Sequence, residues 1–170
     1  PLNGRNFPAN QKKYPDQPIK SKFSHQREKA PPGHYTVSLD DYDIKAELTA
    51  TARCGFHRYS FNKAEQQGLL IDLKYGSKGA CTIVKEDAHD TVRVAHLEIV
   101  DSHTVKGYRI SNGFAPEQHV YFYTQFSKPI KNVDLFLQNK RMEGVTSVSG
   151  TDIKGVFYFE KGDNEQVLIK

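Results

Sequence analysis

The sequence lacks any long hydrophobic run, and no stretch approaches the roughly 20 apolar residues that a membrane-spanning helix needs. We therefore expect no membrane span. It also lacks an initial methionine and a signal-like apolar segment, since it begins at Pro1. These two absences predict a processed chain or an excised piece. The 170 residues, 37% hydrophobic and 26% charged, have the composition of one globular domain.

Cysteine is scarce, with Cys54 and Cys81 as the two examples. Two cysteines cannot define a disulfide framework, and their spacing is not the C-x-x-C of zinc or redox sites. The simplest interpretation is that both are small buried hydrophobic residues. A disulfide between them would require their strands to be neighbours, which leaves both alternatives open.

Charge of one sign does not dominate, because the net charge is +4 and acids and bases are spread along the chain. A nucleic-acid-binding protein usually carries a basic stripe on a matching fold. The nearest approach is a group of basic residues in the proline-containing N-terminal segment: Lys12, Lys13, Lys20, Lys22, Arg27 and Lys29. No recognised motif accompanies them, so we predict no nucleic-acid partner.

Catalytic and metal-binding motifs are also missing. There is no G-x-S-x-G nucleophile elbow and no P-loop spacing. The seven histidines stand singly, and "EDAHD" at residues 86–90 reads better as a polar hairpin turn than as a metal cluster. The acids Glu47, Asp72 and Glu98 lie on expected strands without a recognisable partner. We therefore assign no catalytic residue and no metal ligand in this chain.

What the sequence does contain is a series of short stretches with period two. From Tyr35 onward apolar and polar residues alternate, as in antiparallel strands with one solvated face. Polar segments rich in Gly, Asp, Asn, Ser and Pro separate the strands, as turns require. The expected strands include "YTVSL", "IKAELTAT", "HRYSF", "GLLIDL", "ACTIV", "TVRVAHLEIV", "TVKGYRIS", "QHVYFYTQF", "NVDLFLQ", "KGVFYFE" and "QVLIK". Many short strands at regular spacing predict an all-β protein, a sandwich or a barrel.

The N-terminal part differs from the rest. Residues 1–31 are polar and carry most of the prolines, so we expect an irregular arm or connection there. No linker or fixed-period repeat interrupts the remainder. Residues 32–170 are therefore expected to form one β-sandwich domain.

Residues 48–61, "LTATARCGFHRYSF", contain the most suggestive polar side chains. If the strand continued through this stretch, Arg53, His57 and Tyr59 would lie in a row on one face, with Gly55 leaving space between them. Arginine and histidine donors beside a tyrosine ring could recognise sugar hydroxyl groups. The alternative is that Arg53 pairs with an acid across the sheet and His57 is an ordinary strand residue.

Longer segments carry a resemblance to a known family. They are "FSHQREKAPPGHYTVSLDDYDIKAELTATARCGFHRYSF" at 23–61, "IDL" at 71–73, "GYRISNGFAPEQHVYFYTQFSKP" at 107–129 and the closing "QVLIK". Residues 23–170 thereby resemble the N-terminal β-sandwich domain of glycoside hydrolase family 92, the calcium-dependent, exo-acting α-mannosidases. The resemblance implies an antiparallel β-sandwich of the galactose-mutarotase-like supersandwich type, here expected to be incomplete at both ends.

The same resemblance implies a division of labour. An (α/α) helical barrel, absent from this chain, would carry the acid and base that release mannose with inversion, and calcium would bind at that substrate site. The sandwich alone would be inactive, and the parent enzyme would act on mannose-containing glycans as a secreted, periplasmic or cell-surface protein. Within the chain, the residues expected to contact substrate or the missing domain are Arg53, His57, His25, Glu28 and Arg109.

Two other functions remain open from the sequence. A stand-alone carbohydrate-binding module would need exposed aromatic residues, for which Tyr121, Phe122, Tyr123, Tyr158 and Phe159 are candidates. Consecutive residues on a strand point to opposite faces, so at least half of these should belong to the core. A structural or protein-interaction domain should instead show an apolar patch or an unpaired edge strand.

Overall fold

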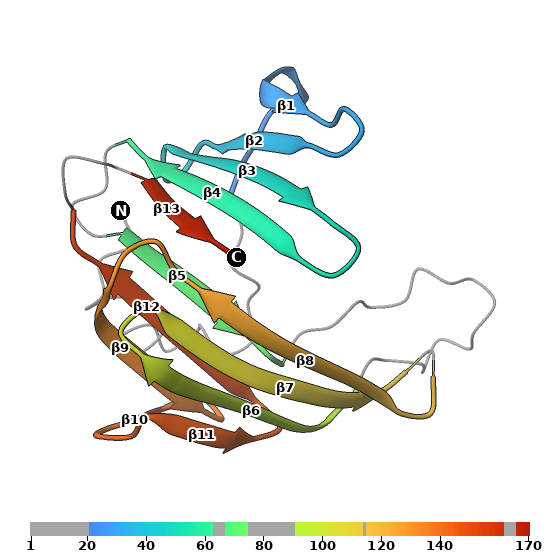
Figure 1. The fold of residues 1–170 in the computed structure, drawn as a ribbon, viewed down its shortest axis with the longest axis vertical. Coiled ribbons are helices and arrows are strands. Elements are labelled where there is room, and N and C mark those ends of the chain that lie inside the picture. The colour runs from blue at the N-terminus through green and yellow to red at the C-terminus, as the bar shows by residue number, and fades with distance from the viewer. Residues whose placement is uncertain (1–20, 63–66, 75–90, 114, 162–165) are drawn as a thin grey trace. The chain divides into compact units, whose positions relative to one another are not determined.

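The computed structural model describes residues 21–62, 67–74, 91–113, 115–161 and 166–170 (Figure 1). These residues form strands, with one short 3₁₀ turn, η2 (His25–Arg27), near the beginning. The strands in chain order are β1 (Glu28–Lys29), β2 (Tyr35–Leu39), β3 (Ile44–Ala50), β4 (Gly55–Phe61), β5 (Gln67–Asp72), β6 (Thr91–Asp101), β7 (Thr104–Asn112), β8 (Gln118–Gln125), β9 (Ile130–Leu137), β10 (Lys140–Met142), β11 (Ser147–Gly150), β12 (Ile153–Phe159) and β13 (Gln166–Ile169). No helix among them has the length and apolarity to cross a membrane.

The chain divides into two compact units. The first comprises residues 1–68, 124–132 and 158–170, and the second comprises residues 69–123 and 133–157. The first unit holds a five-stranded sheet with the order β1-β2-β3-β4-β13 (Figure 1). Two four-stranded sheets, β10-β9-β12-β5 and β11-β6-β7-β8, belong mainly to the second unit.

The five-stranded sheet of the first unit has one apolar and one polar face. Its register places Val37 opposite Ala46, Ala46 opposite Tyr59, and Tyr59 opposite Val167. Val37, Ala46 and Val167 are buried, as alternation predicts for one face of each strand. The same unit buries Phe126 and Phe159, whose ring centroids lie 5.2 Å apart. The opposite face of the sheet is therefore the solvated one.

In the second unit two sheets pack face to face. A Cβ on Gly155 of β12 would lie 2.6 Å from the Leu97 side chain of β6, and one on Gly150 of β11 would meet Leu137 of β9. Glycine at these positions lets the large side chains of the facing sheet approach the backbone. Leu97, Val105, Ile153, Val156 and Phe157 are buried to 1% exposure or less. The predicted antiparallel β-sandwich is thus confirmed.

Most strands lie where the alternation placed them, with three differences. Residues 28–29 of the expected irregular arm pair with β2 as β1, and the short strands β10 and β11 were not expected. These strands span four residues or fewer, too few to display a period. The expected strand "ACTIV" and the "EDAHD" turn lie outside the described residues, as do residues 1–20.

Candidate functional site

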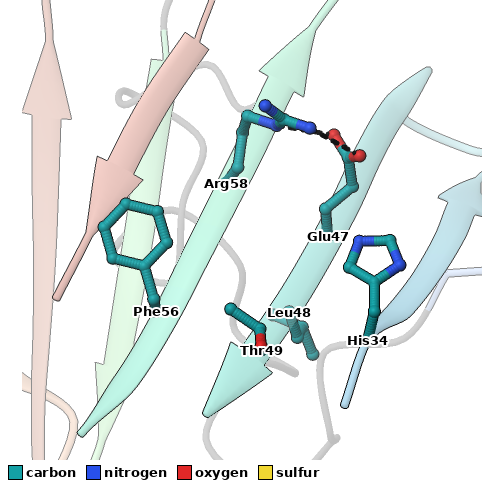
Figure 2. A pocket seen from close by; sticks show the side chains of 6 residues that line it. All are labelled: His34, Glu47, Leu48, Thr49, Phe56 and Arg58. Carbon is teal, nitrogen blue, oxygen red and sulfur yellow. Dashed lines mark hydrogen bonds and ion pairs between the residues drawn. The ribbon is translucent and has the colours of Figure 1, made fainter. Parts of the chain in front are cut away.

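A small pocket opens on the solvated face of the first unit's sheet, over β3 and β4. The hairpin register sets Glu47 opposite Arg58 and Thr49 opposite Phe56. Because side chains alternate, these four leave the sheet on the face opposite the buried Ala46. The pocket has a volume of about 200 Å³. Its lining consists of His34, Glu47, Leu48, Thr49, Phe56 and Arg58 (Figure 2); we call it the β3–β4 pocket.

The strongest polar interaction of the β3–β4 pocket joins Arg58 to Glu47. Arg58 donates from Nε and Nη2 to the two Glu47 carboxylate oxygens, each at 2.7 Å. Figure 2 shows this pair bridging the two strands, with the Phe56 ring on β4 and His34 just before β2. The Glu47 side chain is 11% exposed, whereas that of Arg58 is 45% exposed. A bidentate pair of this kind fixes the orientation of both groups.

The ion pair changes the acidity of both partners. Hydrogen bonds from Arg58, helped by Lys45 at 3.2 Å and opposed by partial burial, lower the pKa of Glu47 from 4.5 to about 2. The same contact raises the pKa of Arg58. Glu47 is therefore a permanent carboxylate near neutral pH, suited to accept hydrogen bonds and unsuited to donate a proton.

We expect Glu47 to make the stability of the domain pH-dependent. A carboxyl group whose pKa is lower in the folded chain stabilises the fold above its unfolded value of 4.5 and loses this contribution as pH falls toward 2. Because Arg58 is open to solvent, the effect should be about 1 kcal/mol. Urea denaturation of the wild type and Glu47→Gln should show this gap at pH 7 and a clearly smaller one at pH 3. An equal gap at both pH values would contradict the assignment.

The sequence model of the family described as "Glycosyl hydrolase family 92 N-terminal domain" matches residues 1–170. The chain belongs to this family. No curated protein matches it.

Solved structures of family 92 enzymes contain the same fold. An α-mannosidase from Bacteroides thetaiotaomicron is 25% identical over 88% of this chain, with a TM-score of 0.75. Its complex with mannoimidazole matches over 91% with a TM-score of 0.76, again at 25% identity. An inverting mannosidase from the same organism is 25% identical over 88%, with a TM-score of 0.68. This family 92 N-terminal domain spans 18–20% of the length of those chains.

The predicted row of Arg53, His57 and Tyr59 is not formed in this family 92 domain. Strand β3 ends at Ala50, and residues 51–54 make the hairpin loop, in which Thr51 N–H bonds to Cys54 O at 2.8 Å. Arg53 therefore lies in the loop and not on the strand, which corrects the continuous-strand interpretation. His57 and Tyr59 do share a face, where a 3.1 Å hydrogen bond joins their side chains and burial lowers the pKa of His57.

His25 and Glu28 are brought together at the edge of the same sheet. His25 Nδ1 lies 2.6 Å from a Glu28 oxygen, and the Tyr35 hydroxyl donates to the other oxygen, also at 2.6 Å. The bonds from Tyr35 and then His25 lower the pKa of Glu28, while that of Tyr35 is raised. The His25 side chain is 88% exposed. This pair thus presents an oriented imidazole to solvent.

Arg109 belongs to the second unit, where it donates to two neighbouring residues. Its Nε donates to the Leu73 backbone oxygen and its Nη1 to the Ser111 hydroxyl, each at 2.9 Å. Both acceptors lie in the second unit as well. Within the first unit the structure therefore joins His25 to Glu28 and His57 to Tyr59, whereas Arg109 belongs to the second unit.

Sequence reasoning missed the β3–β4 pocket. Glu47, taken as a strand acid without a recognisable partner, pairs with Arg58, and Glu98 likewise contacts Lys106 at 3.2 Å. The sequence pattern of the hairpin could have predicted the pocket. Two alternating strands joined by a short loop set Glu47 and Thr49 beside Arg58 and Phe56.

The described residues offer no metal centre. No group of three or more His, Cys, Asp or Glu side chains within them could hold an ion. Cys54 is a free cysteine, and Cys81 lies outside the described residues. Calcium takes six to eight oxygen ligands, carboxylates among them, and the described residues contain no such group of three or more acids.

Proposed function

We propose that the chain is the N-terminal β-domain of an exo-acting, inverting α-mannosidase that hydrolyses mannose-containing glycans, and that it does not cleave bonds alone. The family match over residues 1–170 carries this proposal. The 25% identity to two solved mannosidases, of whose chains it spans about a fifth, supports it. The remaining part of such an enzyme, an (α/α) barrel, would hold the catalytic acid, the catalytic base and the calcium ion.

The electrostatics of the described carboxyl groups support this division. An inverting glycosidase needs one carboxylic acid that stays protonated, which requires a raised pKa. At six described carboxyl groups hydrogen-bond donors favour the charged form and lower the pKa against the opposing effect of burial, which at Asp152 is the largest single cause. These groups are Glu28, Glu47, Glu98, Asp101, Asp152 and Glu160. None of the six suits the general acid, so we assign that acid to the barrel.

Among the described residues no group of three or more His, Cys, Asp or Glu side chains could hold a calcium ion. We therefore derive no step through calcium from these residues and place its site outside them. The role of the domain in this proposal is to support the barrel, with the exposed His25–Glu28 pair and the loop residue Arg53 as candidate contacts to substrate or barrel. The proposal includes a secreted, periplasmic or cell-surface location, as the resemblance implies.

An activity assay tests the proposal. The 170-residue chain alone should not release product from an aryl α-mannoside or a mannobiose, whereas a polypeptide extended through the following domain should release mannose with inverted configuration. Chelation should abolish the activity of the longer polypeptide, and added Ca²⁺ should restore it. Cleavage that tracks with the 170-residue chain through purification would refute the division of labour, and an inactive extended polypeptide would refute the enzyme assignment.

A second candidate function, glycan binding by the domain itself, is favoured by exposed rings. Tyr121 and Tyr123 on β8 are 70% and 59% exposed. The other proposed platform residues do not belong to it, because Tyr158 and Phe159 are 2% and 1% exposed and Phe122 packs over Gly107 on the other face. The two tyrosines leave too small a platform to carry this function alone.

A further inference from the structure

We propose that the β3–β4 pocket is a saccharide-binding site that takes one neutral pyranose ring of a glycan. The ring would lie against Phe56, and its hydroxyl groups would bond to the Glu47–Arg58 pair. This inference deepens the proposed function, from which we take only mannose as the first probe. The chemical class of the ligand follows from the pocket itself.

The aromatic wall is the first argument. Phe56 is 40% exposed on a sheet face that is otherwise mainly polar. The residue opposite it on β3 is Thr49, whose short side chain donates at 2.6 Å to the Gly33 backbone oxygen. Because the Thr49 side chain is short and its hydroxyl group is already bonded, it leaves the surface of the Phe56 ring accessible. Ligand pockets typically combine such a ring with a few fixed polar groups.

The fixed polar groups are the second argument. Arg58 uses two N–H groups for Glu47, out of the five that a guanidinium carries. Glu47 Oε1 already contacts Arg58 and the Lys45 ammonium, the latter at 3.2 Å, but Oε2 can accept a second hydrogen bond, because a carboxylate offers about four lone-pair sites. The pair therefore presents donors and acceptors side by side in one locked geometry. Adjacent hydroxyl groups of a sugar, each both donor and acceptor, match that arrangement.

Charge and size select the ligand class. Glu47 neutralises Arg58 and also holds the Lys45 ammonium at 3.2 Å, so an anion would have to compete with Glu47 for these cations and a cation would have to displace one of them. A neutral ligand keeps the pair intact. The volume of about 200 Å³ lies below the roughly 300–1,000 Å³ of pockets for drug-sized molecules. One neutral, hydroxyl-rich ring therefore fits better than a nucleotide or a longer oligosaccharide.

The proposal can be tested by titrating the full 170-residue chain with methyl α-D-mannopyranoside and with methyl β-D-glucopyranoside. The amide NMR signals of the chain report the binding. Saturable shifts are expected at Thr49, Phe56 and Arg58. Phe56→Leu should weaken binding by about fivefold, whereas Phe56→Trp should retain it, because stacking depends on an aromatic ring. The matched control is Phe23→Leu, which removes another exposed ring that does not line the pocket and should leave binding unchanged.

Several outcomes would overturn the site. The first is the absence of a saturable shift with either pyranoside up to about 50 mM. The second is tighter binding of glucuronate or inorganic phosphate than of the pyranosides, and the third is equal affinity of Phe56→Leu and wild type. Binding of the glucoside without the mannoside would support the pocket while counting against mannose as its ligand. These readouts need no turnover, so failure of the site and failure of the enzyme assignment are separable: the former appears in the titration and the latter in the cleavage assay.

Discussion

Gly107→Ala is expected to lower the free energy of unfolding by about 3 kcal/mol, through overpacking of a buried site. Gly107 lies on β7 opposite Leu97, which is fully buried. A Cβ at this position would meet the His96 backbone oxygen and lie 2.6 Å from the Phe122 ring. The ring can turn, but the carbonyl belongs to the neighbouring strand and cannot move without breaking the ladder. The substitution should therefore act on backbone pairing as well as on packing.

Gly55→Ala is the matched control for this prediction. Gly55 also lies on a strand, but its nearest neighbour to a built Cβ is His57 Nε2 at 3.6 Å, an ordinary contact. We expect a change within about 0.5 kcal/mol, because alanine also restricts the unfolded chain. Urea denaturation of the two variants measures the contrast. Equal stability of Gly107→Ala and Gly55→Ala would show that the β7 backbone yields to the added methyl group.

Asp152→Ala is expected to destabilise the second unit by a similar amount, about 3 kcal/mol, because it removes one member of a nearly buried ion pair. Lys154 is 7% exposed, and its Nζ lies 3.0 Å from Asp152 Oδ1 and 2.9 Å from Asn139 Oδ1. Lys74 reaches the second Asp152 oxygen at 2.9 Å. Removing the carboxylate deprives the buried Lys154 ammonium of the Asp152 counter-charge.

The lysine provides the control. Lys154→Met replaces the buried charge with an apolar side chain of similar length, so it should cost about 1 kcal/mol, and Asp152→Ala should cost less in its presence than in wild type. Burial raises the pKa of Asp152, but bonds from Lys74 and Lys154 outweigh it and hold the pKa below 3.8. The penalty should thus be full at neutral pH and shrink as pH falls below 3.8. Strictly additive effects would mean that the two side chains do not interact.

The fold was largely predictable because the alternation of apolar and polar residues along a strand is visible in the sequence. Strands such as Thr91–Asp101 and Thr104–Asn112 are long enough to show the period of two, and they appear where it placed them. The two-residue strand Glu28–Lys29 is too short to show any period. Its pairing with β2 depends on a neighbour that comes later in the sequence.

The candidate site was predictable only in part. Arg53 was placed on a strand because the polar alternation of 48–61 reads continuously, but the hairpin loop at 51–54 removes it from the β4 face. The residues that line the β3–β4 pocket were not singled out, since each is ordinary by itself. Their significance comes from the cross-strand register that sets Glu47 beside Arg58 and Thr49 beside Phe56.

By itself the sequence determined that the chain is antiparallel β and that it belongs with the family 92 N-terminal domains, because strand alternation and family segments are local properties of residues. Only the tertiary structure decided which residues meet. A one-residue change in register or loop length moves every side chain of a strand to the opposite face. The pairing of Glu47 with Arg58, and the placing of Arg109 in a unit other than that of His57, therefore followed from how the strands associate.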